Sequence, residues 1–184
     1  MNDLGKISIK IKDFISNSVG EWRSMRSGHS LAFQQFEEIK SKIIIEALEI
    51  DDANVREVLK KTNYKKDKAV SPFKMNWEAE SDWNDEVSLN DSNGSCYLIP
   101  IPKTLNSGLI IRSTGYAEQI QAVSIYNFLN DESFVIKTKY AHSRCEEKIW
   151  FPSENFRCRA SIIFSKDGNS ILQTSFASEI KKLT

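Results

Sequence analysis

The feature that most constrains the fold is a succession of short segments in which apolar and polar residues alternate. Alternation with a period of two is typical of a strand that buries one face. Turn-forming stretches such as LNDES, SEN and KDGNS separate the segments closely enough for hairpin connections. We predict a strand in each of ten segments: 22–33, 38–50, 69–80, 94–102, 107–114, 117–128, 133–143, 145–153, 155–164 and 170–181. We therefore predict an all-β fold of antiparallel strands, either a sandwich or a closed barrel.

Two further stretches have helical periodicity. Residues 10–19 repeat apolar side chains at helical spacing and are followed by Gly20, a residue that commonly ends helices. Residues 52–62 begin with acidic residues, end with lysines and carry one apolar stripe. We predict a short amphipathic helix at each place, and the second could form a lid or cap.

Charge and cysteine content exclude several classes of function. Lysine plus arginine and aspartate plus glutamate number 25 each, so no overall field attracts nucleic acid or an anionic membrane. The N-terminal stretch does not resemble a signal peptide, and no apolar run is long enough to insert in a membrane. Three cysteines without CxxC spacing and two histidines predict reduced thiols and no metal site. We expect a cytoplasmic protein that recognises its partners locally.

Two arginines stand on one face of the segment 155–164. Alternation places Arg157, Arg159 and Ser161 on one side and Cys158 on the other. Adjacent guanidinium groups repel each other unless an anion lies across them, and arginine binds carboxylates in a bidentate manner. The pair therefore suits a ligand with carboxylates. The alternative is a solvated outer face with surface ion pairs.

Two other strands place candidate site residues beside small or apolar ones. Met75 and Trp77 share a face, which indicates either core packing or a planar wall on which a conjugated ligand stacks. Glu179 shares a face with Ser175 and other small residues, so it points inward if that face lines the interior. A partly buried carboxylate can act as an acid or base, or accept hydrogen bonds from ligand N–H groups. A surface glutamate is the alternative.

The segment 22–33 lacks a clean apolar face, because Trp22, Ser24 and Arg26 share one side. His29 lies on the other side, and no nucleophile motif accompanies it, so we predict a structural role for it.

These stretches together resemble the S-type phycobiliprotein lyases, the CpcS/CpeS group. The resemblance runs through FISNSVGEWRSMRSGHSLAF at 14–33, MNWE at 75–78, WFPSENFRCRAS at 150–161 and SEI at 178–180. It implies a single bilin-binding domain over 1–184: a ten-stranded antiparallel barrel, similar to lipocalins and fatty-acid-binding proteins, with an N-terminal helix.

The resemblance also implies an activity: attaching an open-chain bilin to a cysteine of an apo-phycobiliprotein subunit through a thioether bond. The bilin is then the substrate, so no cofactor is expected. MNWE slightly favours phycoerythrobilin over phycocyanobilin, and with it a phycoerythrin subunit. A homodimer is compatible with the resemblance.

The residues carried over fall into two groups. The implied catalytic residues are Glu179 and Arg157. The implied ligand-binding residues are Arg159, Trp77, Met75, Trp22, Ser24, Arg26 and Ser161. Two other functions remain open, a noncatalytic carrier barrel for a bilin, fatty acid or other anionic hydrophobe, and an interaction module whose arginines face solvent.

Overall fold

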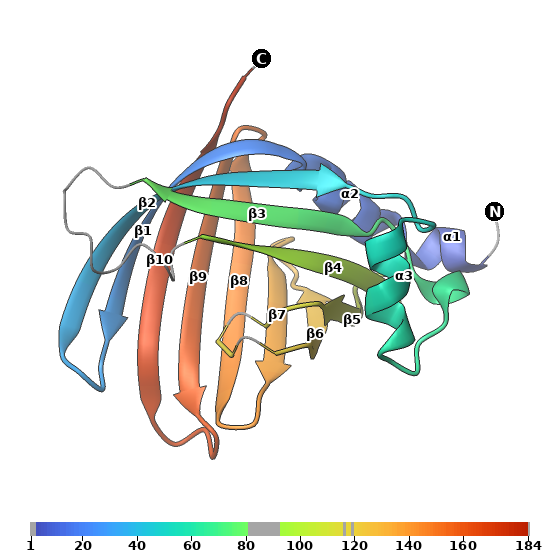
Figure 1. Cartoon of the computed structure of the whole chain (residues 1–184). Helices are drawn as coiled ribbons and strands as arrows, with labels where there is room; N and C mark the ends of the chain where they lie inside the picture. The colour runs from blue at the N-terminus through green and yellow to red at the C-terminus, as the bar shows by residue number, and fades with distance from the viewer. Residues whose placement is uncertain (1–2, 81–92, 116, 119, 184) are drawn as a thin grey trace.

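The computed structural model describes residues 3–80, 93–115, 117–118 and 120–183, and these residues form one closed antiparallel barrel (Figure 1). Each strand pairs with its neighbours in sequence, and β10 pairs with β1 to close the barrel. The strands are β1 (Gly20–Ser30), β2 (Gln35–Ala47), β3 (Phe73–Glu80), β4 (Gly94–Pro102), β5 (Ser107–Arg112), β6 (Ala122–Phe128), β7 (Phe134–Lys139), β8 (Ser143–Ser153), β9 (Phe156–Ser165) and β10 (Ile171–Lys181). The predicted all-β, ten-stranded barrel is confirmed.

The helices are few and short. They are α1 (Asp3–Ile7), α2 (Ile9–Ser18), α3 (Ala53–Lys60) and the 3₁₀ turn η1 (Lys66–Lys68). The segments predicted as helices at 10–19 and 52–62 correspond to α2 and α3, whereas α1 and η1 were not predicted. In the described part of the chain, no helix is long and apolar enough to cross a membrane.

Helix α2 closes one end of the barrel. Ile11 and Ile15 are buried in the main core, and the ring of Phe14 stacks on that of Phe134 with the centroids 4.1 Å apart. The chain leaves the helix through Gly20, whose φ of 132° is readily adopted only by glycine, and enters β1 directly. The apolar stripe of α2 therefore covers this end of the barrel.

Helix α3 is not a lid. Its stripe of Val55, Val58 and Leu59 packs on the outward-facing side chains of β4 and β5, among them Ile99 and Ile111. Strands β4 and β5 are thus buried on both faces, which explains their unbroken apolar runs. The interpretation of 52–62 as a lid was wrong because the two strands offer an apolar outer surface that the stripe covers.

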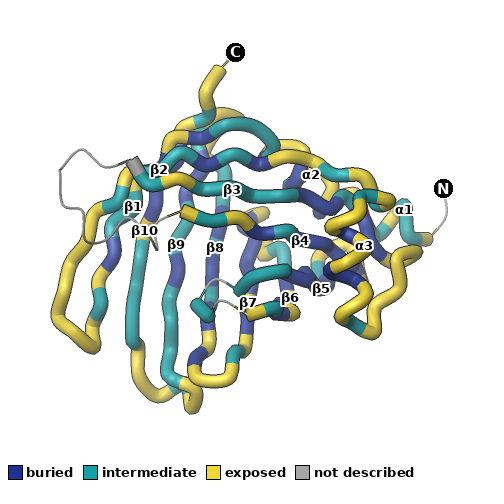
Figure 2. The backbone as a smooth tube through the Cα atoms, in the orientation of Figure 1, coloured by how far each residue is buried: buried dark blue, intermediate teal, exposed yellow. Residues whose placement is uncertain are grey.

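The inside of the barrel changes character along its axis. Near α2 it is filled by fully buried apolar and aromatic side chains such as Trp22, Tyr126 and Phe134. Toward the other end, inward-facing residues of β9 and β10 such as Ser175 are only partly buried, and both strands lose their continuous burial (Figure 2). The barrel therefore has a closed, apolar half and an open, polar half.

Candidate binding site

One row of inward-facing residues crosses β1, β10 and β9. Ser24 lies opposite Glu179, and Glu179 lies opposite Arg157, in the registers of the two strand pairs. The Nε–H of Arg157 donates to the Glu179 carboxylate, whose other oxygen lies 3.5 Å from the Ser24 hydroxyl. All three side chains are buried, so the carboxylate is held by neighbours rather than by bulk water.

Trp22 supports this row from the closed end. The Arg157 guanidinium lies over its indole ring, 4.7 Å from the centroid, and the indole N–H donates to the Ser18 carbonyl at 2.8 Å. Trp22 is fully buried, so its indole ring contacts Arg157 and does not line the open half of the interior. Burial lowers the pKa of Arg157, against the opposing charge of Glu179.

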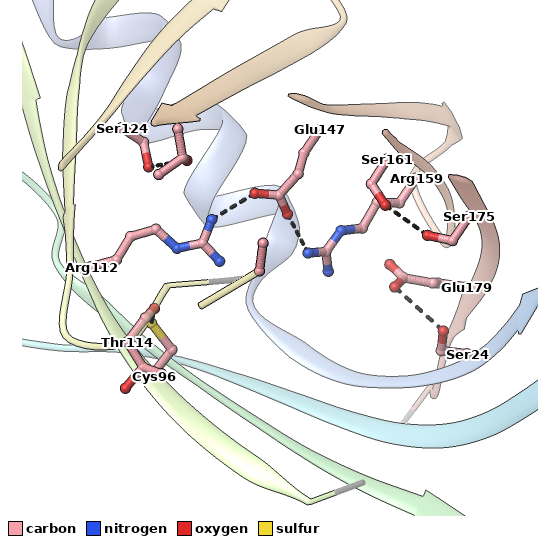
Figure 3. A network of polar contacts seen from close by, with 12 residues as sticks. Ser24, Cys96, Arg112, Thr114, Ser124, Glu147, Arg159, Ser161, Ser175 and Glu179 are labelled. Atoms are coloured by element: carbon pink, nitrogen blue, oxygen red, sulfur yellow. Dashed lines mark hydrogen bonds and ion pairs between the residues drawn. The ribbon is translucent and has the colours of Figure 1, made fainter. Parts of the chain in front are cut away.

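A second charged group lies deeper in the polar half and centres on Glu147 of β8. Arg112 of β5 donates to one carboxylate oxygen at 2.6 Å, and Arg159 of β9 donates to the other (Figure 3). Glu147 is 1% exposed and Arg112 3%. Glu147 therefore connects strands on opposite sides of the interior.

The two guanidinium groups decide the ionisation of Glu147. Burial alone would raise the pKa of this carboxyl, but the charges and hydrogen bonds of Arg112 and Arg159 outweigh that effect and lower it. In turn, burial would lower the pKa of Arg112, and the Glu147 charge raises it instead. Glu147 is therefore a carboxylate at neutral pH.

We expect acid to weaken the barrel through Glu147. Because its folded pKa lies below the ordinary 4.5, its contribution to the free energy of unfolding is complete above that pH and is lost as the pH falls through the folded pKa. Urea unfolding at several pH values tests this. The wild type should lose more stability between about pH 5 and pH 3 than Glu147→Gln does. Equal losses in the two proteins would contradict the prediction.

Hydroxyl pairs extend the polar half. Ser161 and Ser175 are hydrogen-bonded at 2.7 Å between β9 and β10, and Ser124 bonds Thr138 at 2.7 Å between β6 and β7 (Figure 3). These hydroxyl pairs and the arginines give the open half many groups that can donate hydrogen bonds to a polar ligand.

Trp77 and Met75 line the β3 side of the interior. Both are partly buried and pack against the main core. A Cβ atom on Gly94 of β4, which lies opposite Trp77, would come within 2.4 Å of Cζ2 of the indole. Because Gly94 has no side chain, the Trp77 ring has room for its present position.

Gly94→Ala should displace the Trp77 ring. The added methyl group cannot fit beside the present ring position, and relieving such a clash costs about 1–3 kcal/mol. We expect an altered near-ultraviolet circular dichroism spectrum and weaker binding of a bilin, with the barrel still folded. Gly28→Ala is the control for the spectrum, because the atoms nearest to its added Cβ would belong to the flexible Glu37 side chain. An unchanged spectrum in Gly94→Ala would refute the steric argument.

Arg26 stands at the open end. It shares the inward face with Ser24, and its guanidinium pairs with Glu37 of β2 at 3.0 Å while remaining 30% exposed. His29 lies on the outer face, where its ring is 4.9 Å from that of Phe36. The mixed face of β1 is thus the face that looks into the barrel.

The cysteines offer no accessible nucleophile. Cys96, Cys145 and Cys158 are all buried, and burial raises the pKa of the Cys145 and Cys158 thiols. Cys158 faces away from Arg157 and Arg159. Among the described residues, no three side chains of the metal-binding types are gathered together.

The structure brings most of the predicted site residues to one interior. The polar half contains Glu179, Arg159, Ser24 and Ser161 (Figure 3), and Arg157 lies opposite Glu179 in the register of β9 and β10. Two members of the charged group were missed by the sequence analysis, Glu147 and Arg112. Glu147 had a signal, because it alternates with buried Cys145 and Ile149 and so stands on the core face of its strand.

These features define a class of protein: an antiparallel β-barrel closed at one end by a helix, with charged side chains buried in its interior. Comparison with known proteins gives the family. The model of the CpeS-like protein family matches residues 10–182, and the chain belongs to that family.

Several relatives are similar over most of their length. A protein of Trichodesmium erythraeum named chromophore lyase CpcS/CpeS 3 is 46% identical, with 93% of this chain and 98% of that protein aligned. A protein of Microchaete diplosiphon named as a proposed phycoerythrobilin lyase, CpeS, is 40% identical over 83% of this chain and 68% of its own. The solved structure of the S-type phycobiliprotein lyase CPES of Guillardia theta is 32% identical with a TM-score of 0.81, covering 100% of this chain and 99% of that one.

Proposed function

We propose that this protein is a chromophore lyase that binds an open-chain bilin in the barrel and attaches it to a cysteine of an apo-phycobiliprotein subunit. The observation that carries the proposal is the buried charged group in the open half of the barrel. A bilin has a flat conjugated system, pyrrole N–H groups and two propionates. Trp77 offers a surface for the conjugated system, Glu179 offers an acceptor for the pyrrole N–H groups, and Arg159 offers a partner for a propionate. The names of the relatives support the same activity.

The reaction is an addition, and it needs no redox partner. The thiol S–H of the acceptor cysteine adds across the ethylidene double bond of bilin ring A. Carbon gains a bond to sulfur, and the proton ends on the bilin. The nucleophile comes from the acceptor, because this chain's own thiols are buried. The barrel contributes by fixing the bilin's conformation and the face that is attacked.

Glu179 is the residue we assign to proton transfer or to binding the pyrrole N–H groups. Arg157 is a positioning residue, because it holds Glu179 and is itself buried against Trp22. The partial exposure of Arg159, 15% of the side chain, leaves it within reach of a propionate.

The bilin we favour is phycoerythrobilin, with phycoerythrin as the acceptor. The relative named for phycoerythrobilin is 40% identical to this chain, whereas one of a Picosynechococcus strain named as a phycocyanobilin lyase subunit is 27% identical. Further parts of the proposal are that the protein acts in the cytoplasm, needs no cofactor and is free to form a homodimer.

Incubation with purified components tests the function. Protein mixed with phycoerythrobilin should give a coloured complex with a red-shifted absorption band. Adding an apo-phycoerythrin subunit should give a coloured band on that subunit that survives denaturing electrophoresis, and mass spectrometry should identify the modified cysteine. Phycocyanobilin with an apo-phycocyanin subunit is the parallel trial.

A noncatalytic carrier is the second candidate, because the same charged interior could hold a bilin without transferring it. Colour without covalent transfer to any subunit would favour the carrier over the lyase. Absence of a coloured complex with either bilin would contradict both.

A further inference from the structure

Large apolar side chains gather on two hairpins at the open end of the barrel. Strand β1 starts beside α2 at the closed end, and β10 runs antiparallel to it, so the β1–β2 and β9–β10 hairpins both lie at the open end (Figure 1). The first hairpin carries Leu31, Phe33 and Phe36, and β10 begins with Ile171. All four side chains are exposed, and Phe33, at 76%, is the most exposed large apolar side chain in the described part of the chain (Figure 2).

The four side chains, which we call the open-end patch, stand on adjoining pieces of backbone. The N–H of Leu31 donates to the carbonyl of Leu172 at 2.9 Å and so ties the β1–β2 hairpin to the start of β10. None of the four side chains belongs to either buried apolar cluster. Contiguous apolar surface that stays in water is unfavourable and marks a place that a partner covers.

The size of the open-end patch fits a transient partner. An aromatic side chain presents about 150–250 Å², so the four side chains at their observed exposure offer roughly 400 Å². A stable interface takes about 800 Å² from each partner. A second copy of this chain seated on the patch would therefore be held weakly, and it would stand at the opening that the ligand uses. A partner that binds and leaves in each reaction fits both the size and the position.

We propose that the open-end patch is the docking surface for the apo-phycobiliprotein subunit. The inference rests on the proposed lyase function and adds which side of the opening the acceptor contacts. Because α2 closes the other end, the acceptor cysteine reaches a bound bilin only at the open end. A subunit that has not received its pigment exposes apolar surface where the pigment will lie, since sites for such ligands are lined by apolar side chains. Phe33 is then the aromatic anchor of the contact.

Phe33→Ser tests the docking in single-turnover reactions. The protein is loaded with phycoerythrobilin and mixed with increasing concentrations of an apo-phycoerythrin subunit. The subunit concentration that gives half the maximal rate should rise about tenfold, as expected for truncating an aromatic anchor in an interface. The maximal rate and the bilin affinity should stay at their wild-type values. Leu31→Ser should act in the same direction.

Leu105→Ser is the matched control. Leu105 is 43% exposed and lies in the β4–β5 hairpin, at the closed end of the barrel. It offers a similar loss of exposed apolar surface away from the opening. All three quantities should therefore remain unchanged in this variant.

A binding measurement separates the docking from the chemistry. Calorimetry with a subunit whose acceptor cysteine is replaced by serine measures association without transfer, and Phe33→Ser should again weaken it about tenfold. If the wild type transfers bilin and Phe33→Ser keeps the wild-type half-maximal concentration, the docking surface is refuted and the lyase function stands. If the wild type transfers bilin to no subunit, the lyase function fails, and the calorimetry still decides the docking.

Two other occupants of the patch give different results. If Phe33→Ser lowers the bilin affinity and leaves the acceptor affinity unchanged, the patch serves the ligand and the proposal is wrong. If the variant instead abolishes a dimer seen by sedimentation velocity, again with unchanged acceptor affinity, the patch binds a second copy and the proposal is equally wrong.

Discussion

Replacing Glu147 with alanine is expected to lower the free energy of unfolding by about 3–5 kcal/mol, the usual cost of removing one partner from a buried ion pair. Arg112 and Arg159 would then lie in the barrel without the carboxylate they share. Denaturant unfolding followed by circular dichroism measures the change. A lower midpoint with an unchanged slope would show a loss of stability without a change in the surface exposed on unfolding.

Glu146→Ala is the matched control for this measurement. Glu146 is the preceding residue of β8, and its side chain is 42% exposed in a surface pair with Lys137. Exposed pairs contribute roughly 0–1 kcal/mol because water screens them. Similar losses in the two variants would contradict the central role assigned to Glu147.

The second large effect is expected for Glu179→Gln in the transfer reaction. The amide keeps the shape of the side chain but cannot take the proton from the acceptor thiol and pass it to the bilin, and general acid–base catalysis typically contributes about 10²–10⁴ in rate. The rate of adduct formation on the apo-subunit should therefore fall by at least about a hundredfold. Bilin affinity should change far less. Stopped-flow absorbance measures the rate of adduct formation, and equilibrium titration measures the bilin affinity.

Glu154→Gln, in the exposed hairpin between β8 and β9, is the control for Glu179→Gln. It should leave both the rate and the affinity unchanged. If Glu179→Gln weakens bilin binding strongly and leaves transfer from the saturated complex at the wild-type rate, Glu179 binds the pyrrole N–H groups and does not transfer the proton.

The strands of the barrel could be predicted because the residue pattern that indicates each strand lies within its own segment of the sequence. Alternation decides which residues of a strand share a face, so Arg157, Arg159 and Ser161 were placed together correctly. The same argument explains the odd face of β1. This face points into the barrel, with Trp22 near the closed end, Ser24 in the middle and Arg26 at the open end.

What could not be predicted are the contacts across the barrel. Alternation gives a face but no partner, and Arg112 and Glu147 are brought together only when strands β5 to β8 curve round the interior. The sequence analysis treated Arg157 and Arg159 as one pair facing one anion. In the structure each guanidinium has a different carboxylate, because the neighbouring strands β8 and β10 each supply one.

The position of α3 was missed for a related reason. An amphipathic stripe shows that a helix packs on something but does not show on what. The answer lay in β4 and β5, whose successive apolar residues indicate burial on both faces and therefore a covering element.

The closure of one end by α2 has a consequence for the order of events. A molecule held in the barrel must leave through the same opening by which it entered, so a second ligand cannot load until the first has gone. In a lyase of this shape, the acceptor protein must approach the bound bilin from the same end by which the bilin entered, so loading and transfer take place in turn.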